Sequence, residues 1–351
     1  GTDKLREHVM RAVERKPGAV IVISSCVSGI IGDDVKSMEE LSTDEVPVIV
    51  IPADGDINGD YMQGIEMCLH TLADRLIDMN APVREKTVNL IGEIVVGNNT
   101  SLNYESIRKL LGSMGITIGC RFLGDATADE VRNLKSAPLN ILAVDNADNR
   151  RLKAWLADEY GLEFFDRPLP VGMKETKEFL EDIGRYFGCE EAIEDIAAEE
   201  ERAFAKRIEP LKATLKGKKL LMTTINTNTD WLIDAAEACG MDIRWIGCLN
   251  YLHQEDMKVT SRPERASMVE EITDWSIIDQ RIRETSPDII YSSFSSMLPE
   301  YPGILVDDTP LDTVVGFQSG IEILQRWALL SEKNMKGEWM DDRILFEKYF
   351  A

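Results

Sequence analysis

The chain has 351 residues, of which 44% are hydrophobic, and it carries 62 acidic against 39 basic side chains, for a net charge of −23. This length can bury two or three hydrophobic cores, and the acidic balance argues against nucleic acid or an anionic lipid surface as a partner. No apolar run approaches the roughly 18 residues of a membrane span, no signal peptide is visible, and the six cysteines include no Cys-x-x-Cys pair. We therefore expect a cytoplasmic protein without a disulfide framework.

The first expected strand is the continuous, β-branched run Ala19–Ile23. Such a run predicts a parallel strand that is covered on both faces. The segment 24–34 that follows predicts a loop that approaches a ligand, with a helix starting near Val35. Cys26 then falls at the carboxyl end of a buried strand, which is where the functional sites of α/β sheets usually lie. The alternative is that Cys26 is a small buried hydrophobe.

Strands and helices alternate along the rest of the chain, which predicts mostly parallel sheets with helices on both faces. The expected strands are 46–51, 87–91, 116–120, 139–144, 219–223, 242–248, 288–291 and 303–306. The expected helices are 61–79, 103–114, 126–134, 150–160, 174–187, a charged connector over about 191–214, and 320–330. We therefore predict an α/β fold of three Rossmann-like units over residues 1–82, 83–190 and 191–351.

Two polar segments follow strands of the third unit and are candidates for the rim of a substrate cavity. Asn226 and Asn228 lie in the first segment, and Ser292 and Ser293 lie in the second. The competing interpretation is helix capping, which Asn and Ser favour because they bond unpaired backbone N–H groups. The chain has no Gly-x-Gly-x-x-Gly or phosphate-loop motif, so nucleotide binding is unsupported.

The strand-end cysteine and the Ile31-Gly32-Asp33-Asp34 turn after it resemble a motif of the component 1 type oxidoreductases. The similarity continues through segments such as Val88–Gly92 and ends in Gly316–Gly320. This family includes the nitrogenase molybdenum-iron protein subunits, their cofactor-assembly scaffolds and the dark-operative protochlorophyllide reductases. The resemblance implies that Cys26 ligates a four-iron or P-cluster-like iron-sulfur cluster shared with a partner, with Ser25, Gly29 and Gly32 completing the cluster loop.

The chain departs from the nitrogenase α subunit at the residues that hold its catalytic cofactor. The segment Val144–Asn146 lacks the cofactor cysteine, and Pro310–Val315 lacks the cofactor histidine. The histidine near the substrate would match a position close to Ile65, more than a helical turn from His70. The resemblance therefore does not imply dinitrogen reduction at a cofactor held by this chain.

Family subunits also carry about a hundred residues ahead of the helix that opens this chain, and that segment supplies two further cysteines to the cluster. We expect a fragment of a longer subunit rather than a reduced paralogue in which the cluster is lost.

The resemblance as a whole implies an oxidoreductase subunit that pairs with a homologous component 1 subunit, as a homo- or hetero-oligomer. It would accept electrons from an ATP-dependent iron-protein reductase. The alternatives are a metallocofactor-assembly scaffold and a tetrapyrrole-binding or tetrapyrrole-reducing paralogue. A periplasmic metal-chelate binder is disfavoured by the Ile-Gly-Asp-Asp turn.

Overall fold

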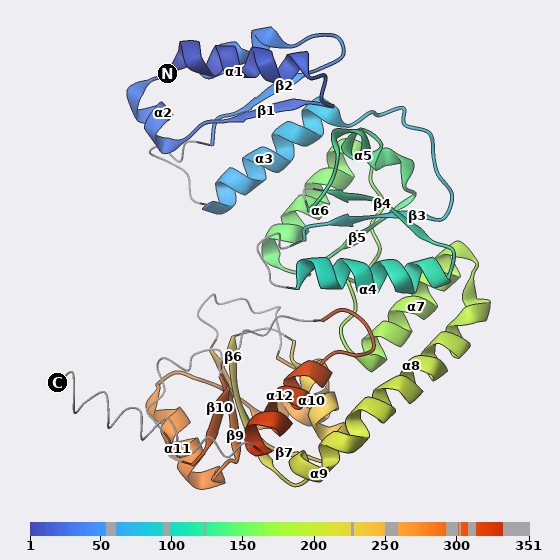
Figure 1. Ribbon diagram of the computed structural model, residues 1–351. Helices are drawn as coiled ribbons and strands as arrows, with labels where there is room; N and C mark the ends of the chain where they lie inside the picture. The colour runs from blue at the N-terminus through green and yellow to red at the C-terminus, as the bar shows by residue number, and fades with distance from the viewer. Residues whose placement is uncertain are drawn as a thin grey trace, which may run out of the picture. The chain divides into compact units, whose positions relative to one another are not determined.

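The protein divides into two compact units in a computed structural model (Figure 1). Unit 1 comprises Gly1–Val96 and Gly115–Leu169, and unit 2 comprises Gly97–Met114 and Pro170–Ala351. The residues that the structure describes are 1–53, 61–93, 99–122, 124–225, 228–249, 259–292, 301, 303–307 and 314–332. No helix in these ranges is long and apolar enough to cross a membrane.

Unit 1 begins with a two-stranded parallel sheet. Strand β1 (Val20–Ile23) pairs in register with β2 (Val48–Ile51). The helices in this part of unit 1 are α1 (Thr2–Glu14), α2 (Cys26–Ile31), the 3-10 helix η1 (Lys36–Leu41) and α3 (Tyr61–Leu76). All four β2 residues are buried, as expected for a β-branched strand between helical layers.

Strand β1, in contrast, is buried on one face and about half exposed on the other. Val22 packs with Val9 of α1, Met38 of η1 and Val48 of β2. Ile21 and Ile23 point to the other face because side chains alternate along a strand, and they are 46% and 61% exposed. The expectation that β1 is covered on both faces is therefore wrong. A continuous apolar run cannot distinguish a covered strand from one whose second face is left open.

A second parallel sheet in unit 1 has the strand order β4-β3-β5. Its elements are β3 (Thr87–Ile91), β4 (Thr117–Phe122), α5 (Ala128–Arg132), the 3-10 helix η2 (Leu134–Ser136), β5 (Leu139–Leu142) and α6 (Ala147–Tyr160). One hydrophobic cluster joins this sheet to the first, since it includes Ile51 of β2, Ile91 of β3 and Leu156 of α6.

Unit 2 is built on a five-stranded sheet with the order β10-β9-β6-β7-β8, and every strand pair in it is parallel. The strands are β6 (Lys219–Ile225), β7 (Asp242–Leu249), β8 (Val269–Glu271), β9 (Ile289–Ser292) and β10 (Leu305–Asp307). The α-helices are α4 (Thr100–Ser113), α7 (Met173–Phe187), α8 (Ile193–Ile208), α9 (Lys212–Leu215), α10 (Asp230–Ala238), α11 (Ser276–Thr285) and α12 (Ile321–Glu332). The 3-10 helices are η3 (Glu190–Ala192), η4 (Glu209–Leu211) and η5 (Pro263–Met268).

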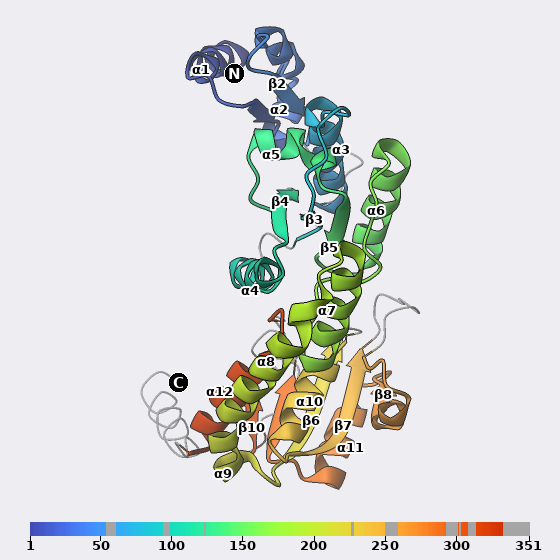
Figure 2. The same ribbon diagram turned by 90° about the vertical axis from the view of Figure 1, so that its right-hand side faces the viewer.

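Both faces of this sheet are packed, as Figures 1 and 2 show. On one face Met222 contributes to a core with Leu232 of α10 and Trp327 of α12. On the other face Leu221 packs in a cluster with Ile278 and Ile282 of α11. Burial on both faces explains why the strands read as apolar runs without alternation.

The α/β fold predicted from the sequence is confirmed, and so is the end of the 174–187 helix at Gly188, which adopts a left-handed conformation (φ 63°). The two sheets of unit 1 share one compact unit, and the five-stranded sheet belongs to the other. The division into 1–82, 83–190 and 191–351 stays a prediction.

Candidate functional site

Cys26 is the first residue of α2 and comes three residues after the last residue of β1. The N–H of Ser24 still bonds to the carbonyl of Ile51 at 3.1 Å, and the chain then turns into the helix, with Ser25 as its N-cap. The Cys26 side chain is exposed, so the alternative that it is a small buried hydrophobe is wrong. A helix does begin near Val35, as expected, in the form of the 3-10 helix η1, but the sequence did not predict the short helix α2 that begins at Cys26.

Short-range capping produces this early helix. The hydroxyl of Ser25 accepts from the N–H of Ser28 at 3.4 Å, and the hydroxyl of Ser28 accepts from the N–H of Ser25 at 3.0 Å. At the other end the N–H of Gly32 bonds to the carbonyl of Gly29 at 3.2 Å, and Gly32 has φ 70°. A left-handed residue of this kind ends a helix with little strain only where glycine stands. The four residues predicted for the cluster loop therefore all belong to α2 or to its caps: Ser25 is the N-cap, Cys26 and Gly29 lie in the helix, and Gly32 is the C-cap.

Exposed apolar side chains lie close to Cys26 in the sequence. Val27, Ile30 and Ile31 of α2 are 62%, 74% and 63% exposed, and the chain carries no charged residue from Gly18 to Gly32. With Ile21 and Ile23 of β1 they form what we call the apolar collar. Exposed apolar patches on soluble proteins mark protein or membrane interaction sites or ligand-binding grooves.

Cys26 has no companion metal ligands in the part of the chain that the structure describes. Among those residues, no three His, Cys, Asp or Glu side chains come together in a way that could hold a metal ion. Asp33 accepts from the hydroxyl of Thr2 at 3.3 Å, and Asp34 accepts from the N–H of Ser37 at 3.2 Å. Asp34 thus bonds the start of η1.

The carboxyl edge of the β4-β3-β5 sheet is closed by an amide side chain. In a sheet of this order a ligand is expected in the crevice between the ends of β3 and β5. There the Nδ2 of Asn149 donates to the carbonyls of Gly92 at 2.9 Å and Val144 at 2.8 Å. Gly92 has φ 75°, and a Cβ on it would lie 2.3 Å from the Asn149 side chain. Asn149 therefore ties Gly92 to Val144, the first residue of the segment Val144–Asn146, in which the resemblance expected a cofactor cysteine.

In unit 2 the corresponding switch point lies between β6 and β9. The hydroxyl groups of Thr223 and Ser292 are 2.7 Å apart there, and both residues are fully buried. Ser292 was predicted from the sequence for a cavity rim. Asn226 and Ser293, predicted with it, lie outside the described residues.

Asn228 links the start of α10 to α7. Its Oδ1 accepts from the N–H of Asp230 at 2.9 Å, which is the capping role considered for it, and its Nδ2 donates to Oε1 of Glu175 at 2.8 Å. Burial raises the pKa of Glu175, while hydrogen bonds from Asn228 and the backbone at Val171 oppose that rise. Asn228 thus holds a partly buried carboxyl group near the carboxyl edge of the sheet. The cavity rim itself stays a prediction.

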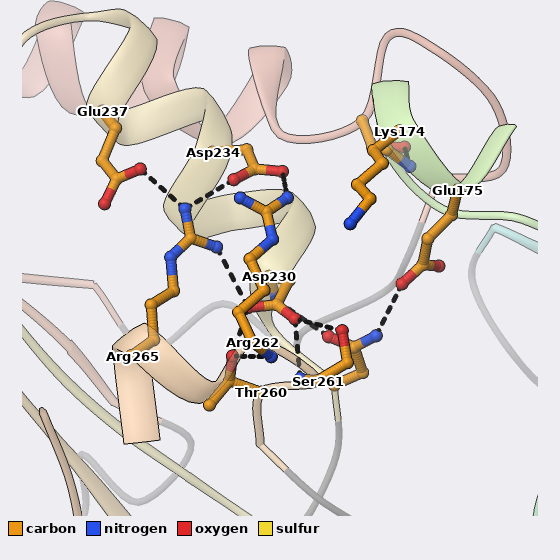
Figure 3. A network of polar contacts seen from close by, with 12 residues as sticks. Lys174, Glu175, Asp230, Asp234, Glu237, Thr260, Ser261, Arg262 and Arg265 are labelled. Carbon is orange, nitrogen blue, oxygen red and sulfur yellow. Dashed lines mark hydrogen bonds and ion pairs between the residues drawn. The ribbon is translucent and has the colours of Figure 1, made fainter. Parts of the chain in front are cut away.

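Sequence reasoning missed a buried ion-pair network beside Asn228 (Figure 3). Arg265 is 5% exposed, and its guanidinium binds three carboxylates of α10. The distances are 3.0 Å to Asp230 and 2.6 Å to both Asp234 and Glu237. The spacing of 230, 234 and 237 places the acids on one helical face, which is the signal that could have revealed the network.

Loop residues complete this network. The carboxylate of Asp230 also accepts from the hydroxyl of Thr260 at 2.6 Å and the N–H of Ser261 at 2.8 Å, and Arg262 pairs with Asp234. Burial would raise the pKa of Asp230, but these hydrogen bonds and the one from Arg265 outweigh burial and lower it. The stability that Asp230 contributes is therefore present at neutral pH and is lost as the pH falls through its folded-state pKa.

A groove of about 580 Å³ runs beside the network. Its apolar floor is formed by Met173, Phe204, Trp231 and Ala235. Its rim carries charges of both signs, and Lys174 lies 4.0 Å from Glu178.

The family model for nitrogenase component 1 type oxidoreductases matches residues 1–330. The chain belongs to this family. It is 24% identical over 336 residues to the nitrogenase molybdenum-iron protein alpha chain of Methanothermobacter marburgensis, covering 92% of this chain and 70% of that one. It is 27% identical over 251 residues to the nitrogenase iron-molybdenum cofactor biosynthesis protein NifE of Rippkaea orientalis, covering 69% and 52%.

A third component 1 relative is the light-independent protochlorophyllide reductase subunit N of Chlorobaculum tepidum, 27% identical over 307 residues, covering 84% of this chain and 67% of that one. The chain thus spans about half to two thirds of the length of several curated relatives. The solved structure "Nitrogenase Cp1 at pH 6.5" aligns with a TM-score of 0.68 at 16% identity, over 95% of this chain and 76% of that one. That likeness confirms the fold.

Replacing Arg265 by Met tests the buried network. The change leaves the carboxylates of α10 without their guanidinium, so we expect a loss of about 3–5 kcal/mol in the free energy of unfolding. Denaturant unfolding followed by tryptophan fluorescence measures it. Arg283→Met is the control, because Arg283 pairs with Asp279 on the exposed surface of α11 and should cost less than about 1 kcal/mol. Equal losses in the two variants would contradict a buried network.

Replacing Glu175 by Gln tests the raised pKa. A carboxyl group with a raised folded-state pKa contributes stability below its unfolded pKa and loses that contribution as the pH rises through the folded value. Gln retains an acceptor for Asn228 but cannot ionise. We therefore expect a higher Tm than wild type at about pH 7.5, and a gain that disappears towards about pH 4.

Glu199→Gln, an exposed change on α8, is the control for Glu175→Gln and should leave the difference between the two pH values unchanged. A Tm gain of Glu175→Gln that is the same at both pH values would show that the pKa of Glu175 is not raised.

Proposed function

We propose that this chain is a subunit of a nitrogenase-like component 1 oxidoreductase that accepts electrons from an ATP-dependent iron-protein reductase. The electrons enter through an iron-sulfur cluster that Cys26 shares with a homologous partner subunit in the cytoplasm. The observation that carries the proposal is the exposed Cys26 thiol at the end of β1, inside the apolar collar. Membership of the component 1 family supports it.

The residues around Cys26 fit one corner of such a cluster. A four-iron cluster takes four thiolates or substitutes, and the described part of the chain offers one, on the surface and without charged neighbours in sequence. The hydroxyl of Ser24, two residues before Cys26, is buried and has no hydrogen-bond partner among the described residues. When bound, the cluster would supply one-electron transfer at low potential.

The chain's own residues have two tasks in this proposal. Cys26 provides a thiolate on a strand-end turn, and the apolar collar excludes water once the partner covers it. A low dielectric around the cluster is one of the factors by which a protein sets its reduction potential. The collar therefore has both an assembly role and an electrostatic role.

The chain does not itself hold a dinitrogen-reducing cofactor in this proposal. The segment Val144–Asn146 has no cysteine for such a cofactor, and Asn149 bridges Gly92 and Val144 beside it. This observation also favours a second candidate function, a metallocofactor-assembly scaffold or a tetrapyrrole-binding or tetrapyrrole-reducing paralogue. The likeness to NifE and to subunit N of a protochlorophyllide reductase supports that second candidate.

The cluster is tested with Cys26→Ala. The natural full-length protein, purified anaerobically with its co-expressed partner, is assayed for iron and acid-labile sulfide. We expect the variant to lose both, because one ligand of a shared cluster is missing. Cys68→Ala is the control, since Cys68 lies on α3 and is only partly exposed. A wild-type complex without iron would refute the cluster.

The partner-covered surface is tested with Ile30→Lys. A charge in the apolar collar should weaken subunit association by about tenfold or more, because desolvating an unpaired ammonium opposes burial. Sedimentation of the co-expressed complex measures it. Val83→Lys is the control, at a residue that is 71% exposed between α3 and β3. Unchanged association of the Ile30 variant would place the partner elsewhere.

A further inference from the structure

Strand β1 has one free edge. Among the strands that the structure describes, it pairs with β2 alone. In that pairing the N–H groups of Val20 and Ser24 bond to carbonyl groups of β2 and of the residue before it, at 2.9 and 3.1 Å. Backbone groups alternate between the two edges of a strand, so the N–H and C=O groups of Ile21 and Ile23 point away from β2. No described residue bonds to those groups.

The outer edge of β2, in contrast, is closed by its own unit. The N–H of Val48 donates to the hydroxyl of Ser42 at 2.9 Å, and the N–H of Val50 donates to Oε1 of Glu39 at 3.5 Å. Glu39 belongs to η1, and Ser42 is the C-cap of η1. The sheet is therefore finished on the β2 side and unfinished on the β1 side.

Strand β1 also lacks the devices that protect an open edge. Edge strands are usually guarded by charged side chains, proline or a bulge, because an unpaired edge recruits further strands. The chain carries neither a charge nor a proline from Gly18 to Gly32, and β1 pairs with β2 without a register shift. The Ile21 and Ile23 side chains are 46% and 61% exposed. These features fit an edge that is covered by another strand.

A groove beside β1 leaves room for the side chains of such a strand. Its volume is about 470 Å³, and its lining includes Ile21 of β1, Leu72 and Leu76 of α3, and Val131 of α5. Asp125 is the single charged residue among those that line it. An aliphatic lining of this kind fits the apolar side chains that a covered parallel strand carries.

The direction of α1 indicates which segment fills the edge. Five residues separate the end of α1 from the start of β1, and Val9 of α1 packs with Val22 of β1. Helix α1 therefore runs back over the sheet, and its N-cap, Gly1, lies towards the carboxyl end of β1. The nitrogen of Gly1 is 3.7 Å from Oδ1 of Asp33, just after α2. A strand that leads into α1 would thus run parallel to β1, as the first strand of a β-α-β unit.

We propose that the free edge of β1 is the docking site for a strand formed by the residues that lead into α1 in the natural protein. This agrees with the expectation from the sequence that the natural subunit is longer. Parallel strands end at the same edge of a sheet, so the added strand would bring its last residues to the edge where Cys26 lies. The inference goes beyond the proposed function, because it needs no cluster and its test measures no iron.

Amide hydrogen exchange in the natural full-length protein tests the added strand. The N–H of Val22 faces β2 and is the internal reference. If the edge is filled, the amides of Ile21 and Ile23 should exchange within about tenfold of the Val22 amide, because all three are then in ladders. NMR at single-residue resolution measures the rates. Unprotected Ile21 and Ile23 amides beside a protected Val22 amide would overturn the proposal.

The same measurement identifies the occupant. It is made on the subunit alone at two protein concentrations, and on the complex with the co-expressed partner. A strand from the same polypeptide protects Ile21 and Ile23 equally in all three samples. Protection only in the complex would assign the edge to the partner, and protection only at the higher concentration would assign it to a second copy. Either result would overturn the proposal.

Two variants at one position give a second readout in the full-length protein. Ile21→Pro removes the N–H that faces the free edge, and Ile21→Ala removes the same side chain but keeps the N–H. Proline is tolerated where the N–H side of an edge strand faces solvent. With the edge filled, we expect the Tm of Ile21→Pro to lie about 2 °C or more below that of Ile21→Ala. Equal Tm values would contradict the added strand, and the exchange rates decide the case if Ile21→Pro does not fold.

Discussion

The pairing of β1 with β2 is the interaction on which the rest of unit 1's proposed site depends. The ladder directs Val20 and Val22 towards α1 and η1, and strand alternation then directs Ile21 and Ile23 away from them. Exposed apolar area costs about 25 cal/mol per Å² relative to burial, so this face favours being covered. Cys26 stands at the end of the same strand, which links its chemistry to whatever covers the collar.

In unit 2 several buried or partly buried charged groups are paired inside the unit. Arg265 neutralises carboxylates on one face of α10, and Asn228 joins the start of that helix to Glu175 of α7. A buried guanidinium is tolerated only with such a complete set of partners. The network therefore holds η5 and α10 together near the carboxyl edge of the sheet, where the Thr223–Ser292 pair lies. A rigid edge suits a protein that binds a ligand between strand ends.

Much of the α/β architecture could be predicted from local pattern. The run Thr87–Ile91 was expected as a strand at the same residues, and the helix expected over 174–187 ends at Phe187, before Gly188. The strand depends on an apolar run, and the helix end depends on the backbone freedom of glycine. Helix α2 was missed because its signal is a reciprocal serine cap rather than an apolar period, and six residues are too few to show one. The Arg265 network was missed because its guanidinium lies 28–35 residues along the chain from the acids it binds.

The sequence by itself determined the alternation of strands and helices, the Gly-Asp-Asp turn after Cys26 and the resemblance to the component 1 family, because these follow from residue type and spacing. Only the tertiary structure decided that one face of β1 is uncovered, that Cys26 is exposed and that Asn149 closes the crevice beside Gly92. The physical reason is that exposure and closure depend on which elements pack together in space. An apolar run has the same composition whether it is covered by a helix of its own chain or left exposed.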